Sequence, residues 1–182
     1  MSLAGEILAI YGARGSAAYF GERVSMSEHG LQAAHFAQCE RAAESLVVAA
    51  LLHDIGHLLE PVPDAIEDWT LDAQHEKSGA RWLARHFDAA VSEPVRLHVA
   101  AKRYLCATDA SYFARLSPAS VHTLKLQGGP MSVDEVAQFE RERFRQEALR
   151  VRRWDDQGKV AGLKTPTLGD FAALIERLAP RG

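Results

Sequence analysis

The sequence predicts an all-α fold, a helical bundle formed as a single domain over residues 1–182. Apolar residues recur at helical spacing along most of the chain, and no stretch alternates apolar and polar residues as a half-buried strand would. The 182 residues, of which 47% are hydrophobic and 25% charged, suit a globular domain with one core. No internal repeat, low-complexity run or long linker divides the chain. These observations together favour one bundle.

The N-terminal part of the chain is expected to form three helices. The first should end at Gly12 and Gly15, before an irregular segment. Ser25 and Glu28 have the spacing of a capping box and predict the start of the second helix. The third, from about Ala42 to Asp54, is apolar on nearly all sides, so it should lie at the centre of the bundle.

A loop is predicted from Glu60 to about Asp72, where Pro61 and Pro63 interrupt the helical pattern. Trp69 in this loop is a candidate packing anchor, and the loop could either cap a pocket or plug the structure. Helices are then expected over residues 75–87 and 91–104, with Pro94 in the first turn of the second.

The C-terminal part should contain shorter elements. Short helical pieces and a loop are predicted from Asp109 to Pro130. Ser132 and Glu135 form a second capping box, which opens a highly charged segment that runs to Trp154. A last helix within residues 163–182 should pack on the bundle.

Charge and cysteine content exclude several classes of protein. Lys and Arg number 21 against 24 Asp and Glu, so a formal charge of -3 gives no electrostatic footprint for nucleic acid or an anionic membrane. Cys39 and Cys106 cannot form a disulfide framework or a Cys-x-x-Cys site. The longest strongly apolar run, residues 46–52, is too short to cross a bilayer, and the N-terminus lacks the pattern of an export signal. We therefore expect a soluble, cytoplasmic protein; its oligomeric state stays open.

Six side chains that commonly bind metal ions fall on different predicted helices: His29, His53, Asp54, His75, His98 and Asp155. Imidazole and carboxylate suit iron, manganese and zinc, and helix bundles often hold such sites in their core. The carboxylate of Asp54 has two oxygens, so it could bridge two metals. The pattern predicts a buried di-metal site.

Four other histidines have weaker patterns. His35, His86 and His122 lack a partner motif and are interpreted as ordinary surface or packing residues. His57 lies four residues after His53, on the same face if the helix continues past Gly56.

The His29, His53-Asp54 and Asp155 pattern resembles the HD-domain superfamily of metal-dependent phosphohydrolases. His75 and His98 extend it to the six-ligand, two-metal version of the site. The resemblance is more specific at four segments: residues 19–22, 53–57, 98–105 and 152–156. These segments are similar to the phosphonate-cleaving HD-domain oxygenases, which are mixed-valence di-iron enzymes related to the inositol oxygenases. The matching motifs span Tyr19 to Asp156.

The resemblance implies roles for individual residues. It implies that one iron is held by His29, His53, Asp54 and Asp155, and the second by Asp54, His75 and His98. The family places its aspartate ligand directly after an aromatic residue, here Trp154, which favours Asp155 over Asp156. Tyr19 resembles the tyrosine that occupies the second iron until substrate arrives, and Glu22 resembles the residue that moves with it and binds the substrate's amino group. The residues that fall where the family binds the phosphonate are His57, Lys102, Ser120, Thr123 and Arg152.

The implied activity is oxidative cleavage of the carbon–phosphorus bond of a small 1-hydroxyphosphonate, with two iron ions in the mixed-valence Fe(II)/Fe(III) state and O2 as co-substrate. The favoured substrate is 2-amino-1-hydroxyethylphosphonate, which would give glycine and phosphate, although a related subgroup accepts a trimethylammonium form. The main alternative is an HD phosphohydrolase acting on a nucleotide or other phosphate monoester. Tyr19 and Glu22 argue against it, because such an enzyme needs no tyrosine that guards a metal. A third hypothesis is a sensor or scaffold that binds metal or phosphate without turnover.

Overall fold

The computed structural model describes residues 2–59 and 74–180 and confirms the all-α prediction. No β-strand occurs in these two segments apart from an isolated bridge between Ala18 and Ser25. The predicted loop at residues 60–72, with Trp69, lies outside the described residues. The helices, in chain order, are α1 (Leu3–Arg14), α2 (Met26–Cys39), α3 (Glu44–Leu52), α4 (Ile55–Leu59), α5 (His75–Leu83), α6 (Ala89–Thr108), α7 (Ala110–Phe113), α8 (Pro118–Leu126), α9 (Val133–Phe139), α10 (Arg145–Gln157), the 3-10 helix η2 (Leu168–Phe171) and α11 (Ala172–Leu178).

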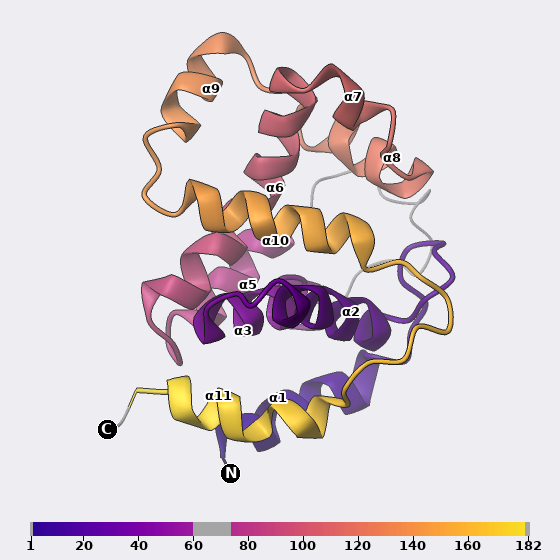
Figure 1. The fold of residues 1–182 in the computed structure, drawn as a ribbon, viewed down its shortest axis with the longest axis vertical. Helices are drawn as coiled ribbons and strands as arrows, with labels where there is room; N and C mark the ends of the chain where they lie inside the picture. Colours follow the sequence, from indigo (N-terminus) through magenta and orange to yellow (C-terminus); the bar gives the residue numbers. More distant parts are fainter. Residues whose placement is uncertain (1, 60–73, 181–182) are drawn as a thin grey trace.

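Helix α3 lies at the centre of the bundle, as its apolar sequence predicts. It packs against α2, α6, α10 and α11, and all its residues from Leu46 to Leu52 are buried. Helix α10 crosses the middle of the molecule, and α11 lies beside α1 at the end where both termini meet (Figure 1). The long helix α6 packs against α3, α5 and α10. Helices α2, α6 and α10, each of which carries a candidate ligand, therefore gather around α3, whose C-cap is His53, and α5, which carries another, packs against α6.

The predicted helix over residues 42–54 is interrupted at the pair that carries the chemistry. Helix α3 ends at Leu52, His53 is its C-cap, and α4 begins at Ile55. Gly56 does not end this second helix but lies within it. A methyl group on Gly56 would overlap the carbonyl of His75, so the glycine is what lets α4 lie directly against α5.

Other boundaries differ from the predictions in smaller ways. Helix α1 continues through Gly12 to Arg14, because packing of its apolar side outweighs the weak helix propensity of one glycine. Helix α6 begins at Ala89, so Pro94 lies in its second turn and removes the hydrogen bond that an N–H would donate to the carbonyl of Ala90.

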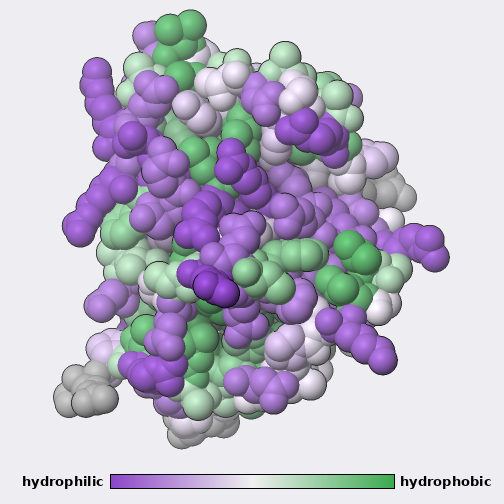
Figure 2. Space-filling view, viewed as in Figure 1, coloured by the Kyte–Doolittle hydropathy of each residue, from purple (hydrophilic) through white to green (hydrophobic). Residues whose placement is uncertain are grey.

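The charged segment after the second capping box forms two helices, α9 and α10. Both predicted capping boxes, at Ser25–Glu28 and Ser132–Glu135, are present. Helix α10 turns Val151 and Trp154 inward, both fully buried, while the face of the molecule that α10 crosses is mostly hydrophilic (Figure 2). Arg152 and Asp155 are buried with the inward side, so a strongly charged helix delivers two charges to the interior.

Within the described segments, no helix combines the length and the apolar character that a membrane span needs.

The contact between α2 and α3 gives a test of the packing. Gly30→Ala is expected to lower the free energy of unfolding by about 1–3 kcal/mol, because the added methyl would lie 2.6 Å from the Leu51 carbonyl oxygen. That oxygen also accepts a hydrogen bond from Tyr11. The matched control is Gly12→Ala in α1, where nothing lies within 4 Å of the added methyl and a gain of about 0.5–1 kcal/mol is expected. Urea unfolding measures both, and a gain at both positions would contradict the close contact.

Candidate metal centre and active site

Four histidines and one aspartate converge in the interior of the bundle. His29 comes from α2, His53 and Asp54 from the break between α3 and α4, His75 from the start of α5 and His98 from α6. Their exposed fractions run from 0% to 8%. Two groups, His29–His53–Asp54 and Asp54–His75–His98, have potential ligand atoms close enough together to hold a metal ion each.

Asp54 lies between the two histidine pairs and turns one oxygen to each. Its Oδ2 is 3.6 Å from Nε2 of His29 and 3.4 Å from Nε2 of His53. Its Oδ1 is 3.1 Å from Nε2 of His75 and 3.5 Å from Nε2 of His98. This arrangement suits a carboxylate that bridges two metal ions, as the sequence predicts.

The other ring nitrogens explain why Nε2 points inward. Three Nδ1 atoms lie at hydrogen-bond distance from main-chain oxygens: His29 at 2.8 Å from Gly158, His53 at 2.8 Å from Ala50, and His98 at 2.7 Å from Val95. Carbonyls only accept, so the network assigns the proton to Nδ1 and leaves a lone pair on each Nε2.

The short distances between the inward nitrogens indicate what the site is built to hold. The Nε2 atoms of His29 and His53 are 3.0 Å apart, and those of His75 and His98 are 3.1 Å apart. Two neutral imidazoles whose lone pairs face each other repel at these distances, so a proton or a metal ion must lie between them; in the metal-free protein His53, with its pKa of about 9, can carry such a proton. The residues therefore fit two metal ions of the class that imidazole and carboxylate bind.

Asp155 approaches the first histidine pair from α10. Its Oδ1 is 3.3 Å from Nε2 of His29 and 3.9 Å from Nε2 of His53, and it has no other partner among the described residues. Its Oδ2 accepts a hydrogen bond of 2.6 Å from Arg152. One oxygen is thus held by the guanidinium and the other is free for a metal.

Charge compensation keeps both buried aspartates ionised. Burial by itself would raise the pKa of Asp54, but the surrounding histidines hold it well below its usual range. Burial likewise opposes ionisation of Asp155, and Arg152 with His29 and His53 holds its pKa well below the usual range. Burial lowers the pKa of His53, but the charges of Asp54 and Asp155 prevail and raise it to about 9 in the metal-free protein.

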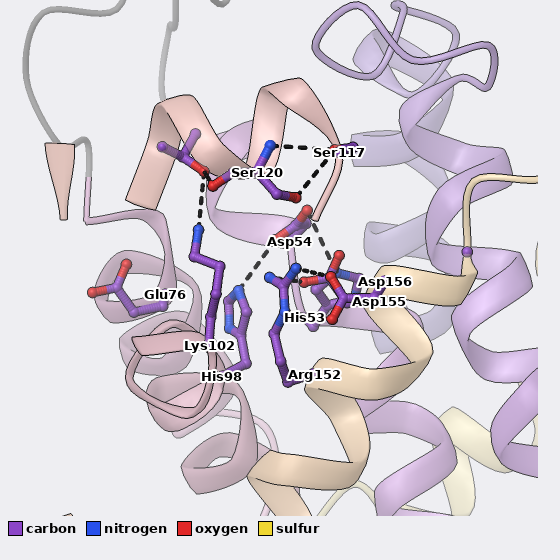
Figure 3. Close-up of polar contacts among 12 residues, drawn as sticks. His53, Asp54, Glu76, His98, Lys102, Ser117, Ser120, Arg152, Asp155 and Asp156 are labelled. Atoms are coloured by element: carbon purple, nitrogen blue, oxygen red, sulfur yellow. Dashed lines mark hydrogen bonds and ion pairs between the residues drawn. The ribbon is translucent and has the colours of Figure 1, made fainter. Parts of the chain in front are cut away.

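A cavity opens onto this centre, and the predicted phosphonate-binding residues line it. His57, Lys102, Ser120, Thr123 and Arg152 all border the cavity, beside the predicted ligands Asp54, His75, His98 and Asp155. Lys102 rises from α6 and donates a hydrogen bond of 2.9 Å to Thr123, while Arg152 rises from α10 toward Asp155 (Figure 3). The cavity therefore combines cations and hydroxyl donors, as an anion-binding site requires.

Arg152 is held by a wider network than the sequence predicts. Besides Asp155, its guanidinium pairs with Asp156 and donates a hydrogen bond of 2.9 Å to the hydroxyl of Tyr112. Tyr112 in turn donates a hydrogen bond of 2.5 Å to Asp156. Asp156, a solvated or supporting residue in the sequence analysis, supports Arg152 from behind.

Tyr19 covers the first histidine pair. Its ring stacks on His29 with centroids 3.8 Å apart and planes 18° apart. Burial, with the charges of Asp54 and Asp155, holds the pKa of Tyr19 well above its usual range, so the hydroxyl stays protonated. Glu22 does not line the cavity; its carboxylate lies 3.3 Å from Nζ of Lys159.

His57 belongs to the site although the helix breaks before it. Its ring stacks on His75 with centroids 3.8 Å apart. Burial and His75 lower the pKa of His57 well below its usual value, so the ring is neutral. His35, His86 and His122 are outside both metal-binding groups and the cavity lining.

Three residues of the site are missing from the sequence prediction. Lys159 and Gln127 line the cavity, and Glu76 is 6% exposed with a carboxylate oxygen 3.8 Å from Nδ1 of His75. Glu76 adjoins a ligand in the sequence, a signal that could have identified it. Lys159 follows the last matching motif by three residues and belongs to no periodic pattern, so only the fold reveals it.

Metal stoichiometry tests the bridging role of Asp54. Asp54→Ala is expected to abolish binding of both metal ions, because it removes a candidate ligand from each group, whereas His98→Ala should remove one. The control is His35→Ala, which lies outside the centre. Elemental analysis after reconstitution measures the content, with circular dichroism to show that each variant is folded. Two metal ions retained by Asp54→Ala would contradict the bridge.

The protonation of Lys102 predicts a pH dependence of anion binding. Burial and the neighbouring Arg152 lower the pKa of Lys102 to about 7, so its charge disappears as the pH rises through this value. Sulfate, which keeps its charge, should therefore bind about tenfold more weakly at about pH 8 than at about pH 6. Calorimetric titration of the metal-free protein measures this. Lys102→Arg keeps its charge and should flatten the profile; a flat profile in the unmodified protein would overturn the assignment.

Comparison with known proteins agrees with this geometry. The model of the HD domain family matches residues 17–154. The chain is 45% identical over 172 residues to the 1-hydroxy-2-(trimethylamino)ethylphosphonate dioxygenase (glycine-betaine-forming) of Leisingera caerulea, covering 94% of this chain and 88% of the relative. It is 47% identical over 163 residues to the hydroxymethylphosphonate dioxygenase of Gimesia maris, covering 87% and 79%. The chain therefore belongs to the HD-domain family, in which these two phosphonate dioxygenases are its homologues.

Proposed function

We propose that this protein is an O2-dependent di-iron oxygenase that cleaves the carbon–phosphorus bond of a small 1-hydroxyphosphonate. The observation that carries the proposal is the cavity lined by Lys102, Ser120, Thr123 and Arg152, which opens directly onto Asp54, Asp155 and the His75–His98 pair. An anion bound there would be next to the metal held by Asp54, His75 and His98. The names of the two homologues support the same reaction class.

The favoured substrate is 2-amino-1-hydroxyethylphosphonate, converted to glycine and phosphate. These products together contain the atoms of the substrate and of one O2, so no external reductant is needed. The two homologues are named for a trimethylamino and a hydroxymethyl phosphonate, so the cavity wall away from the phosphonate must set the choice. Glu22, three residues after Tyr19, is the carboxylate proposed to bind the amino group.

The protein's own residues bind and orient the substrate. Lys102 and Arg152 offset the phosphonate charge, and the hydroxyls of Ser120 and Thr123 direct its oxygens. His57, neutral and stacked on His75, borders the same space. Asp54 and the histidines would hold two irons, proposed to be a mixed-valence Fe(II)/Fe(III) pair, and when bound these irons supply the oxidising power that activates O2.

Tyr19 is proposed to restrict access to the centre until substrate binds. Its ring covers His29, and its protonated hydroxyl lies within the influence of the Asp54 charge. A phosphomonoesterase of the same family could use the metals to activate water, but it has no need of this tyrosine. Tyr19 therefore favours the oxygenase over the hydrolase.

Phosphate release tests the proposal. Iron-reconstituted protein is expected to release phosphate from 2-amino-1-hydroxyethylphosphonate only when O2 is present, and O2 consumption should match phosphate. Tyr19→Phe should change the spectrum of the iron centre on substrate addition, because the hydroxyl near the charges of Asp54 and Asp155 is lost.

Parallel assays separate the hypotheses. The trimethylammonium and hydroxymethyl phosphonates report substrate choice. Phosphate released from nucleotides or simple esters without O2, and none from any hydroxyphosphonate, would establish the phosphohydrolase instead. Full metal occupancy with no reaction on either class would favour a sensor or scaffold.

A further inference from the structure

Lys159 occupies a junction between the two parts of the proposed substrate site. Its Nζ lies 3.3 Å from a carboxylate oxygen of Glu22 and donates hydrogen bonds to the hydroxyls of Ser117 at 3.2 Å and Ser120 at 3.0 Å. It also lies 5.8 Å from the ring centroid of Tyr19. One ammonium thus contacts both the Tyr19–Glu22 turn and the start of α8, where Ser120 faces the cavity.

The backbone on both sides of Lys159 is fixed to α2. The Gly158 carbonyl lies 2.8 Å from Nδ1 of His29 and accepts a hydrogen bond from it. The Val160 N–H donates to Gln32 at 2.9 Å, and the Gln32 amide donates back to the Val160 carbonyl at 2.8 Å. Gln32 is itself 1% exposed. The side chain of Lys159 therefore extends from a rigid base, and its flexible stem can change partners without moving the chain.

The other cations of the cavity are less free to meet an incoming dianion. Arg152 is already paired with Asp155 and Asp156, and its Nε donates to Tyr112. Lys102 is 3% exposed and has its pKa lowered to about 7, because burial and Arg152 disfavour its charge. Lys159 faces a single carboxylate among the described residues, at a distance longer than either oxygen contact of Arg152. Of these three cations, Lys159 is the one that a phosphonate can bring into a new contact at the lowest cost in free energy.

We propose that Lys159 is a positioning residue that exchanges Glu22 for the phosphonate when substrate binds. In the empty site its ammonium neutralises Glu22 and holds the Tyr19–Glu22 turn over the metal centre. With substrate present it turns to the phosphonate oxygens beside Ser120, and the released Glu22 carboxylate becomes available to the cationic end of the substrate. The inference rests on the proposed function and adds to it the residue that links phosphonate binding to amine recognition.

A double-mutant cycle tests the exchange with inorganic phosphate as the probe. Calorimetric titration of iron-loaded protein without O2 gives the dissociation constants. Lys159→Met is expected to weaken phosphate binding by about tenfold, because a charged hydrogen bond is lost. Glu22→Gln should tighten it by about two- to fivefold, because phosphate no longer competes with a carboxylate for the ammonium. In the Lys159→Met background, Glu22→Gln should have no effect.

A purely structural role for Lys159 would not give this pattern. Lys164→Met, at an exposed lysine of the same segment, is the matched control and should leave phosphate affinity unchanged. No tightening by Glu22→Gln, or equal tightening in both backgrounds, would overturn the exchange while leaving the oxygenase intact. Failure of the unmodified protein to release phosphate from any hydroxyphosphonate would overturn the proposed function, and this inference with it.

Discussion

A buried carboxylate between two pairs of imidazoles is the interaction around which the bundle is organised. Asp54 is 7% exposed, and removing such a charge from water costs several kcal/mol unless nearby groups compensate it. Four helices supply that compensation, because α2, α3, α5 and α6 each deliver one histidine to it. The packing of these helices is therefore coupled to the electrostatics of the centre. A metal ion in each histidine group would complete the compensation of the buried carboxylate charge.

The arrangement has a clear division between fixed and adjustable parts. Main-chain carbonyls hold three of the four histidines through Nδ1, so the proposed ligands cannot rotate without breaking buried hydrogen bonds. Around them lie side chains whose contacts can change, above all Lys159 with its partly exposed partner Glu22. A rigid metal centre lets an enzyme keep its reacting geometry fixed, while the side chains around it can change their contacts when substrate binds.

Family membership narrows the chemistry without choosing the substrate. HD-domain proteins share the His-Asp core, and the homologues named here oxidise two different phosphonates. The groups proposed to bind the phosphonate can serve any member of this substrate class, because they contact only the end that all share. The Tyr19–Glu22 turn is proposed to face the end at which the substrates differ, and Lys159, 3.3 Å from Glu22, is proposed to link that end to the phosphonate.

The sequence by itself determined the helical class, the capping boxes at Ser25 and Ser132, and the chemical identity of the candidate ligands. These are local properties, fixed by periodicity, by spacing or by the donor atoms that a side chain carries. Only the tertiary structure decided that the helix breaks at His53–Asp54, that Pro94 lies in the second turn of α6 and not in its first, and that Lys159 reaches both Glu22 and Ser120. The close approach of α4 to α5 accompanies the helix break, and the course of the chain after α10 places Lys159. They depend on contacts between residues far apart in the sequence, which no local pattern encodes.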